Sequence, residues 1–389
     1  MPASRTIQAM TALTTVAILA AAAFLTQPGL KDDKPAQPPA IPSPAAPAAQ
    51  PDQPKTDDPA STVRFGLKKA PAKAPGTIRI TTFNIENMFD DKDDPKLSGN
   101  FEDKNSTKPA DQLKAAADAI IALDADIVCL EEVESEEAVK WFRDNWLKGA
   151  GYDHIASLDA GDPRGIEQAV ISRFPIKNAR NYVHQKLGGR QPDKWGKDNN
   201  PEAGSPFEFK RSPLQVTITV PNTSVADLLK KAGKTEARAE AYELTLFVVH
   251  LKSGGRDYDA QREAEAGGTI KLVEAVTKEN PKANVLVLGD CNATLNQQSL
   301  VKFASAGMPS IWNDRNPRDT VTMTHTTARC IDHIFYNANI KPELKLDSRF
   351  VLGMPAIPAN ADYRVTPKPK GYASDHYPVS IDLTPVEAN

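Results

Sequence analysis

The sequence predicts an α/β protein in which strands and a few long helices alternate between about residues 77 and 385. Short apolar runs of strand length recur along this part of the chain, and segments with helical spacing of apolar residues lie between them. The composition agrees with a globular fold, because 40% of the 389 residues are hydrophobic and 25% are charged. We therefore expect a layered domain with strands inside and helices outside.

Two kinds of pattern predict the strands. Residues 77–83 (TIRITTF) alternate apolar and polar side chains, which favours a strand with one buried face. Residues 126–130 (DIVCL) and 284–288 (NVLVL) are short apolar runs, which favour buried strands. Patterns of these kinds predict further strands at 167–171, 214–220, 244–250, 330–335 and 377–383.

Helical spacing predicts three main helices, at residues 111–123, 134–146 and 260–278. The last of them stops shortly before a proline, as helices commonly do. Residues 222–242 are expected to form a helical excursion between two strands. Residues 184–212 are polar and rich in glycine and proline, so we expect them to form a long surface loop.

The N-terminus has the pattern of an export signal. Residues 6–30 carry no charge, Arg5 precedes them, and residues 16–25 form an apolar run with small residues near its end. We therefore expect residues 1–27 to be a signal peptide and the protein to be exported, either periplasmic or secreted. An uncleaved membrane anchor is the alternative, but the strong apolar run is shorter than the ~20 residues that span a bilayer.

A proline-rich linker is expected next. Residues 28–59 contain ten prolines among alanine, glutamine and charged residues, a composition that cannot bury a core. We expect the linker to extend over residues 28–76, and the folded domain to span residues 77–385. A chain that begins near Gly76 should then still fold.

Charge and cysteine content narrow the function classes. The formal net charge of −3 gives no indication of nucleic-acid binding, although a local basic cleft is compatible with it. Cys129, Cys291 and Cys330 are too few for a disulfide scaffold and lack the spacing of a zinc site. We expect them to be buried as small hydrophobic residues, although export would permit one disulfide bond.

Polar side chains stand at the ends of several predicted strands. Glu132 and His250 each close a strand, the segment from Asp290 to Asn292 follows another, and Asp332 lies inside a further one. A carboxylate in such a buried position is costly unless it is paired or binds a metal. Gathered on one sheet edge, these oxygen-rich groups suit Mg²⁺, Mn²⁺ or Ca²⁺ better than zinc.

Seven stretches occur in one order along the chain: TFNIENMFD, ADIVCLEEVE, RGIEQAVISRFPI, HLKSGG, VLVLGDCNA, RCIDHIFYN and SDHYPV. With these stretches the sequence resembles the endonuclease/exonuclease/phosphatase superfamily of DNase I-like, metal-dependent phosphohydrolases over about residues 77–385. The resemblance implies a four-layer α/β sandwich, in which two packed mixed β-sheets are flanked by helices. It also implies a divalent cofactor, Mg²⁺ or Mn²⁺, with Ca²⁺ as a further option.

The resemblance also implies roles for the matched residues. It implies metal ligands at Asn84, Glu132 and Asp375. It implies a catalytic set formed by His250, Asp290, Asn292, Asp332 and His376. Two cations inside matched segments are expected to bind the substrate phosphate, because such groups grip phosphate oxygens: Arg164 and Lys252.

At one position the sequence departs from the family pattern. Glu131 stands where the family usually has glutamine, and we expect it to add negative charge beside Glu132. Among the other histidines, a structural role is expected for His154, His184 and His333, whereas His325 is left unassigned. The general base also stays open, since either Asp290 or an Asp332–His376 pair could take a proton from the attacking water.

The sequence therefore favours an exported, metal-dependent phosphoesterase that cleaves phosphodiester bonds by direct attack of water, with a nuclease as the first hypothesis. A sphingomyelinase-like lipid phosphodiesterase or a phosphomonoesterase is the alternative, and the apolar run at 350–357 is its candidate membrane-binding hairpin. A non-catalytic binding module is a third hypothesis. The expected partner is a phosphate-ester substrate such as nucleic acid, no protein partner is implied, and we expect a monomer.

Overall fold

The computed structural model describes residues 63–97, 103, 105–234, 241–316, 319–358, 361–362 and 365–386. The predicted signal peptide and the predicted linker up to residue 62 lie outside the described residues. No helix in the described part of the chain is both long enough and apolar enough to cross a membrane.

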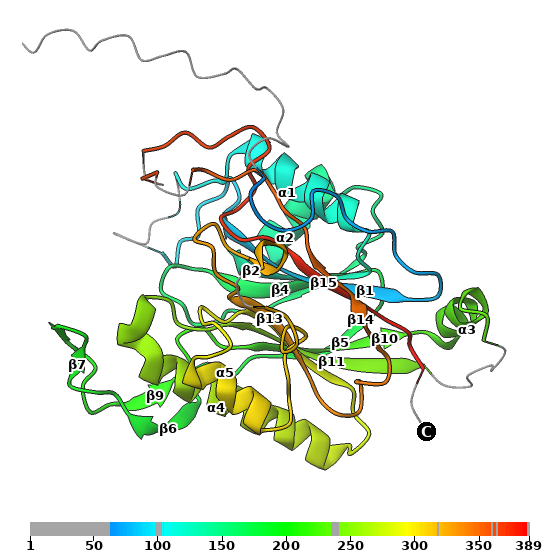
Figure 1. The fold of residues 1–389 in the computed structure, drawn as a ribbon. Helices are drawn as coiled ribbons and strands as arrows, with labels where there is room; N and C mark the ends of the chain where they lie inside the picture. The colour runs from blue at the N-terminus through cyan, green and yellow to red at the C-terminus, as the bar shows by residue number, and fades with distance from the viewer. Residues whose placement is uncertain are drawn as a thin grey trace, which may run out of the picture. The chain divides into compact units, whose positions relative to one another are not determined.

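Two mixed β-sheets packed against each other form the centre of the fold (Figure 1). The first sheet has six strands in the order β14 (Leu344–Val351), β15 (Val379–Leu383), β1 (Ile78–Met88), β2 (Ile127–Val133), β4 (Glu167–Ser172) and β3 (His154–Ser157). The second has five strands in the order β13 (Asp332–Tyr336), β12 (Val285–Asp290), β11 (Tyr242–His250), β10 (Leu214–Val220) and β5 (Ile176–Arg180). One parallel pair lies in each sheet, β1–β2 in the first and β11–β12 in the second.

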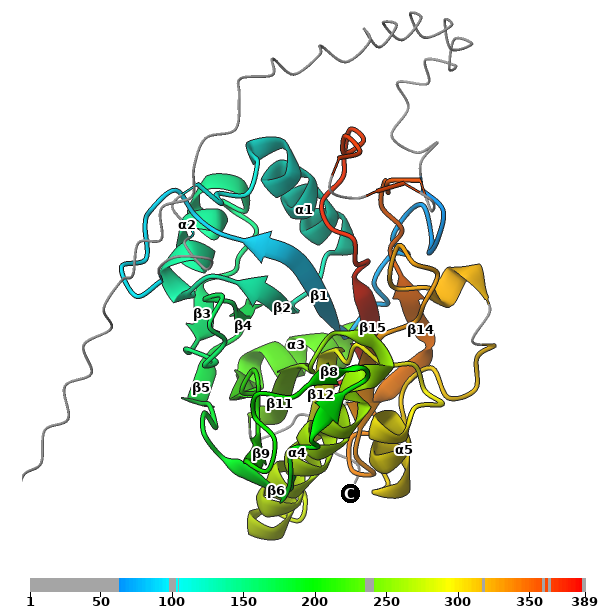
Figure 2. The ribbon, with the colours of Figure 1, turned by 90° about the vertical axis from the view of Figure 1, so that its left-hand side faces the viewer.

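Helices cover both outer faces, so that the fold has four layers. Helices α1 (Ala110–Leu123) and α2 (Glu136–Trp146) lie over the six-stranded sheet, as both views show (Figure 2). Helices α4 (Asp259–Glu279) and α5 (Gln298–Ser305) pack on the outer face of the five-stranded sheet. The predicted four-layer α/β sandwich is confirmed.

Alternation along the strands explains this layering. In β11, Leu246 and Val248 belong to the core shared with the other sheet, whereas Phe247 and Val249 belong to the cluster under α4 and α5. Successive side chains of a strand point to opposite faces, so a continuous apolar run can fill two cores at once. The apolar runs in the sequence therefore mark the strands that are covered on both faces.

The structure adds elements that the sequence patterns did not reveal. Strands β3, β5 and β14 and helix α5 were not expected. The predicted surface loop at 184–212 is corrected, because it holds two small two-stranded sheets, β6 (Lys186–Arg190) with β9 (Pro206–Glu208) and β7 (Lys194–Trp195) with β8 (Asp198–Asn199). These strands are short and mostly exposed, so they carry no apolar run. Helix α3 (Asn222–Lys231) is the expected excursion before β11.

Residues 63–76, expected to be linker, pack against the domain. The Leu67 amide donates a 2.8 Å hydrogen bond to the last carbonyl of β14, and Phe65 lies 6.3 Å from Tyr377 between ring centroids. Farther along, Lys73 forms a 2.8 Å ion pair with Asp126. The folded part therefore begins at least fourteen residues before the expected boundary at 77, at Val63 or earlier.

A chain that begins at Gly76 should consequently be less stable than one that begins at Val63. It loses the partly buried side chains of Phe65 and Leu67 from the edge of the core. We expect the free energy of unfolding to fall by about 2 to 3 kcal/mol. Urea unfolding of the two chains measures the difference, and equal stabilities would show that the docked segment contributes nothing.

Candidate active site

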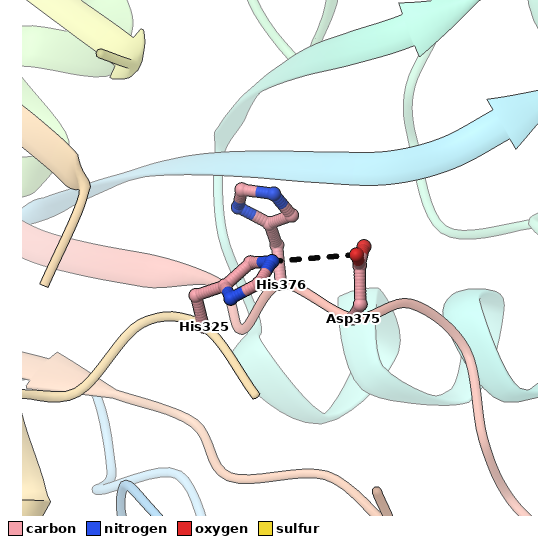
Figure 3. Close-up of side chains that lie close together, drawn as sticks. All are labelled: His325, Asp375 and His376. Atoms are coloured by element: carbon pink, nitrogen blue, oxygen red, sulfur yellow. Dashed lines mark ion pairs between the residues drawn. The ribbon is translucent and has the colours of Figure 1, made fainter. Parts of the chain in front are cut away.

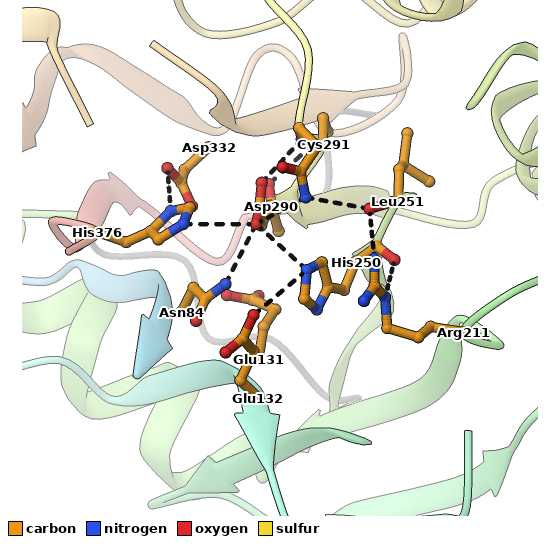
Figure 4. Close-up of polar contacts among 12 residues, drawn as sticks. Asn84, Glu131, Glu132, Arg211, His250, Leu251, Asp290, Cys291, Asp332 and His376 are labelled. Atoms are coloured by element: carbon orange, nitrogen blue, oxygen red, sulfur yellow. Dashed lines mark hydrogen bonds and ion pairs between the residues drawn. The ribbon is translucent and has the colours of Figure 1, made fainter. Parts of the chain in front are cut away.

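A cluster of polar side chains lies between the two sheets, near the carboxyl ends of several strands (Figure 4). From the six-stranded sheet come Asn84 of β1 and Glu132 of β2, and from the five-stranded sheet come His250 of β11 and Asp290 of β12. The two parallel pairs explain the meeting, because parallel strands bring their carboxyl ends to the same edge of a sheet. His376 joins the cluster from the turn before β15.

Asp290 is the hub of this cluster. Its Oδ1 accepts a 2.8 Å hydrogen bond from the Asn292 amide. Its Oδ2 accepts hydrogen bonds from Nδ2 of Asn292 at 3.1 Å and from Nδ2 of Asn84 at 3.2 Å. The same oxygen lies 3.3 Å from His250 Nε2 and 3.6 Å from His376 Nε2. Asn84 thus joins the two sheets through one carboxylate.

The surroundings of Asp290 shift its pKa to near neutral pH. Burial raises the pKa of Asp290 to about 7, with the nearby Asp332 adding to the rise and His376 opposing it. A carboxyl group with such a pKa can accept or release a proton under physiological conditions.

Asp332 and His376 form the expected pair. Both carboxylate oxygens of Asp332 lie 3.0 Å from Nδ1 of His376, which therefore carries a proton and donates it. Burial disfavours the charged imidazolium, but the charges of Asp332 and Asp290 outweigh this and hold the pKa of His376 well above its usual range. His376 is thus a charged donor whose Nε2 faces Asp290.

His250 has the opposite electrostatic character. Burial, together with the charge of Arg211, holds the pKa of His250 well below its usual range, so the ring is neutral. Its Nε2 lies 3.3 Å from Asp290 Oδ2 and 3.7 Å from Glu132 Oε1, whereas its Nδ1 is buried and has no hydrogen-bond partner in the described structure. His250 can therefore donate from Nε2 without carrying a charge.

Arg211 forms hydrogen bonds with the backbone at the end of β11, a role that the sequence did not reveal. Its Nε donates to the carbonyl of His250 at 3.0 Å, and one terminal nitrogen donates to the carbonyl of Leu251 at 2.9 Å. The other terminal nitrogen pairs with Asp162 at 3.3 Å. This buried guanidinium fixes the backbone that carries His250 and adds positive charge beneath it.

A backbone irregularity turns Glu132 into the site. Regular alternation would point Glu131 and Glu132 to opposite faces, but Glu132 has a φ of 63° and the register of β2 shifts there. Its Oε2 accepts a 3.1 Å hydrogen bond from the Asn87 amide, which leaves Oε1 facing His250. The bulge lets two consecutive glutamates reach the region between the sheets.

Glu131 does not have the charge that was expected. Its side chain is fully buried, Thr82 donates a 2.7 Å hydrogen bond to Oε1, and Oε2 has no donor within the described residues. Burial raises the pKa of Glu131 well above its usual range, so the group is neutral. The raised pKa argues against the predicted negative charge at Glu131, because a protonated carboxyl group is neutral and close to glutamine in shape.

Asp375 directly precedes His376 in the chain and forms an ion pair with a histidine. Its Oδ2 pairs with Nε2 of His325 at 3.3 Å (Figure 3). The Thr327 amide donates to Nδ1 of His325 at 3.1 Å, so the His325 proton is on Nε2 and points at Asp375.

One further charged residue near the site, Lys108, carries no sequence signal. Lys108 is buried and donates a 2.8 Å hydrogen bond to the carbonyl of Glu86. Burial lowers the pKa of Lys108 to about 8, although the charges of Glu86, Asp375 and Glu132 act in the opposite direction. Lys108 therefore supplies positive charge to a region that gathers three carboxylates.

The expected substrate-binding cations lie at the rim. Arg164 is 41% exposed and reaches within 4.0 Å of Glu132. Lys252 is held over the ring of Tyr258, with Nζ 4.3 Å from the centroid. His333 is buried and bonds through Nε2 to the carbonyl of Ala293 at 3.1 Å, in keeping with a structural role.

The three cysteines have the buried positions that the sequence predicts. All three cysteines are buried and free.

Carboxylate and amide oxygens dominate the cluster, and hard divalent cations prefer this donor set. The carboxylate of Asp290 is buried beside the amide of Asn84. Glu132 Oε2 accepts a hydrogen bond, and its Oε1 and Asp290 Oδ2 both lie near His250 Nε2. The residues present therefore fit a Mg²⁺-type cation better than zinc.

The neutral state of Glu131 predicts the behaviour of Glu131→Gln. Wild-type stability should fall relative to the variant as the pH rises above about 4.3, the ordinary pKa of glutamate, because the fold favours the protonated form. The advantage of the variant should grow by up to about 1.4 kcal/mol per pH unit until the folded protein ionises. Urea unfolding from pH 4 to 8 tests this, with the exposed Glu137→Gln as control. A pH-independent difference would mean that Glu131 is charged.

Solved structures of several proteins are similar to this chain at low sequence identity. The catalytic domain of human Nocturnin with bound sulfate is 16% identical, with a TM-score of 0.49 and coverage of 84% of this chain and 98% of that one. An endonuclease/exonuclease/phosphatase from Beutenbergia cavernae is 16% identical, with a TM-score of 0.47 and coverage of 79% and 71%. Truncated TDP2 from Caenorhabditis elegans is 14% identical, with a TM-score of 0.44 and coverage of 79% and 97%.

No curated protein sequence matches this chain. The model of the endonuclease/exonuclease/phosphatase family, in contrast, matches residues 81–376, which include the whole cluster around Asp290. This match spans most of the chain and confirms the resemblance that the seven stretches predicted. The chain belongs to the endonuclease/exonuclease/phosphatase family.

Proposed function

We propose that this protein is a divalent-metal-dependent phosphodiesterase that cleaves nucleic acid by direct attack of water. The family to which it belongs consists of hydrolases of phosphate esters. The observation that carries the proposal is the buried Asp290, whose pKa of about 7 suits a general base and which hydrogen-bond donors from both sheets surround. No covalent nucleophile is required.

Asp290 is the better candidate for the general base. It can take the proton of the attacking water near neutral pH. His376 cannot easily do so, because its two neighbouring carboxylates keep it protonated. The Asp332–His376 pair instead supplies a fixed positive charge and a proton donor for the phosphoryl oxygens, where negative charge builds up in the transition state.

His250 and the two amides complete the set of donors. Nε2 of His250 and Nδ2 of Asn84 lie 3.3 Å and 3.2 Å from Asp290 Oδ2, so both donors are held beside the proposed general base, where a phosphate oxygen would lie. Asn292 has a φ of 48° and is fixed by a 3.1 Å hydrogen bond to the carbonyl of Leu251, so its amide is held in place. Donors that are positioned beforehand need no reorganisation during the reaction.

A Mg²⁺-type cation would be held by Glu132 and Asn84. When bound, such an ion stabilises charge on the phosphoryl oxygens and lowers the pKa of water. Asp375 was expected to be a third ligand. Because its carboxylate pairs with His325, we assign it to the surroundings of the ion and not to its direct ligands.

Nucleic acid is favoured over a lipid substrate by the position of the apolar run at 350–357. Phe350, Leu352, Met354 and Ile357 are all at most 6% exposed, so the run belongs to the core and not to an exposed hairpin. Arg164 and Lys252 flank the site and match the charge of a phosphate chain. A binding module, in turn, would gain nothing from a buried carboxylate that titrates near pH 7.

Export remains part of the proposal, on the strength of the uncharged N-terminal segment behind Arg5. Fractionation of the expressing cells followed by N-terminal sequencing tests it. Mature protein that starts near residue 28 outside the cytoplasm would support export, and full-length protein in the cytoplasm would refute it.

Activity should depend on a divalent metal. Chelator-treated protein should lose hydrolysis of DNA or RNA, and Mg²⁺ or Mn²⁺ should restore it. Glu132→Gln removes the charge of a ligand and should raise the metal concentration for half activity by about tenfold or more. Assays against DNA, RNA, sphingomyelin and simple phosphate monoesters would identify the substrate class. Full activity after exhaustive chelation would exclude the metal mechanism.

His376→Ala and Asp332→Asn should act on the same step. Each change should lower kcat by about 10²- to 10⁴-fold, and the double variant should lose little more, because either change alone disables the pair. A double-mutant cycle on kcat at saturating metal measures the coupling, and His154→Ala on the edge strand β3 serves as control. Multiplicative losses would show that the two residues work separately.

A further inference from the structure

A cavity of about 220 Å³ lies beside the catalytic cluster, on the side of His376 that faces His325. Its lining includes His325 and Asp375, and the ring centroids of His325 and His376 are 4.5 Å apart. Ile357 and Pro358 form an apolar part of the wall. None of the catalytic roles proposed above uses this space.

Arg64, from the docked N-terminal segment, lines the cavity and is held in place there. One terminal nitrogen of its guanidinium donates to the carbonyl of Thr326 at 3.1 Å and to that of Ile357 at 3.0 Å. The Thr326 amide in turn donates to the carbonyl of Asp375 at 2.9 Å. A short chain of hydrogen bonds therefore connects Arg64 to the residue next to His376.

The charge of Arg64 is not balanced within the cavity. The two lining carboxylates have other partners, since Glu86 pairs with Lys368 at 3.4 Å and Asp375 with His325 at 3.3 Å. Among the described residues, no carboxylate lies within ion-pair distance of Arg64, whose guanidinium lies over the Phe65 ring at 5.1 Å from the centroid. A half-buried guanidinium without a counter-ion favours an anion, and its planar donors suit a phosphate group.

We propose that Arg64 binds a second phosphate group of the substrate, next to the one that is hydrolysed. The inference rests on the proposed function, because a nucleic acid chain carries such a phosphate on the neighbouring nucleotide. The cavity has room for only part of the chain, and its apolar wall can contact the sugar or base between the two phosphates. Arg64 lies upstream of residues 81–376, so the subsite is an addition to the part that matches the family.

Binding of short ligands to the full-length protein tests this subsite without relying on turnover. The ligands are a thymidine dinucleotide with no terminal phosphate and the same dinucleotide with a phosphate at its 5′ or its 3′ end. Titration calorimetry in the presence of chelator prevents cleavage. In the wild type, a terminal phosphate at one of the two ends should tighten binding by about tenfold, as expected for charge-assisted hydrogen bonds.

Three variants locate the effect. Arg64→Ala and Arg64→Gln should reduce the gain from the phosphate to less than about twofold and leave binding of the unphosphorylated dinucleotide unchanged. Gln keeps hydrogen-bond donors but removes the charge, so its comparison with Ala separates the loss of charge from the loss of a polar side chain. Lys68→Ala removes the same charge from an exposed position of this segment and should keep the full gain. A gain that persists in both Arg64 variants, or that is absent from the wild type, overturns the inference.

A parallel assay separates this inference from the proposed function. Hydrolysis of bis(4-nitrophenyl) phosphate with Mg²⁺ needs no second phosphate, so it reports on the proposed function alone and should be equal in wild type and Lys68→Ala. If the phosphate-dependent binding is present but no phosphodiester is hydrolysed, the proposed function fails and the subsite stands. If hydrolysis occurs and the phosphate adds nothing to binding, the subsite fails and the proposed function stands.

Discussion

The carboxylate of Asp290 is the interaction on which the rest of the site depends. A buried carboxylate is tolerated only where donors surround it, and here these donors come from both sheets and from the turn before β15. The packing of the two sheets must therefore hold Asn84 within 3.2 Å of Asp290. The apolar residues of β11 and β12, which fill the cores on both faces of their sheet, provide that rigidity.

Two histidines contact the same carboxylate and yet have opposite charge states. His376 is paired with Asp332 through Nδ1 and stays protonated, whereas His250 lies above Arg211 and stays neutral. The difference arises from the charge placed behind each ring, since both rings are buried. Asp290 therefore has one charged donor, His376, and one neutral donor, His250. The charged donor is the ring that Asp332 pairs with.

Segments outside the family pattern shape what lies around this centre. Residues 63–76 dock beside β14 and bring Arg64 to the cavity next to His376. Lys252 and Arg164, by contrast, come from matched segments and lie at the rim of the cluster. The catalytic groups themselves are fixed by regular strands. Specificity is therefore expected from the added segments and loops, which can vary without disturbing the sheets.

The sequence by itself determined the layered fold and the residues that gather at the strand ends, since apolar runs and strand-end polar groups are local patterns. Only the tertiary structure decided the charge of Glu131, the buried position of Arg211 and the pairing of Asp375 with His325. It also decided that residues 63–76 belong to the folded part. The physical reason is common to all four, because burial, pKa and docking depend on neighbours from distant segments, and a local pattern carries no information about them.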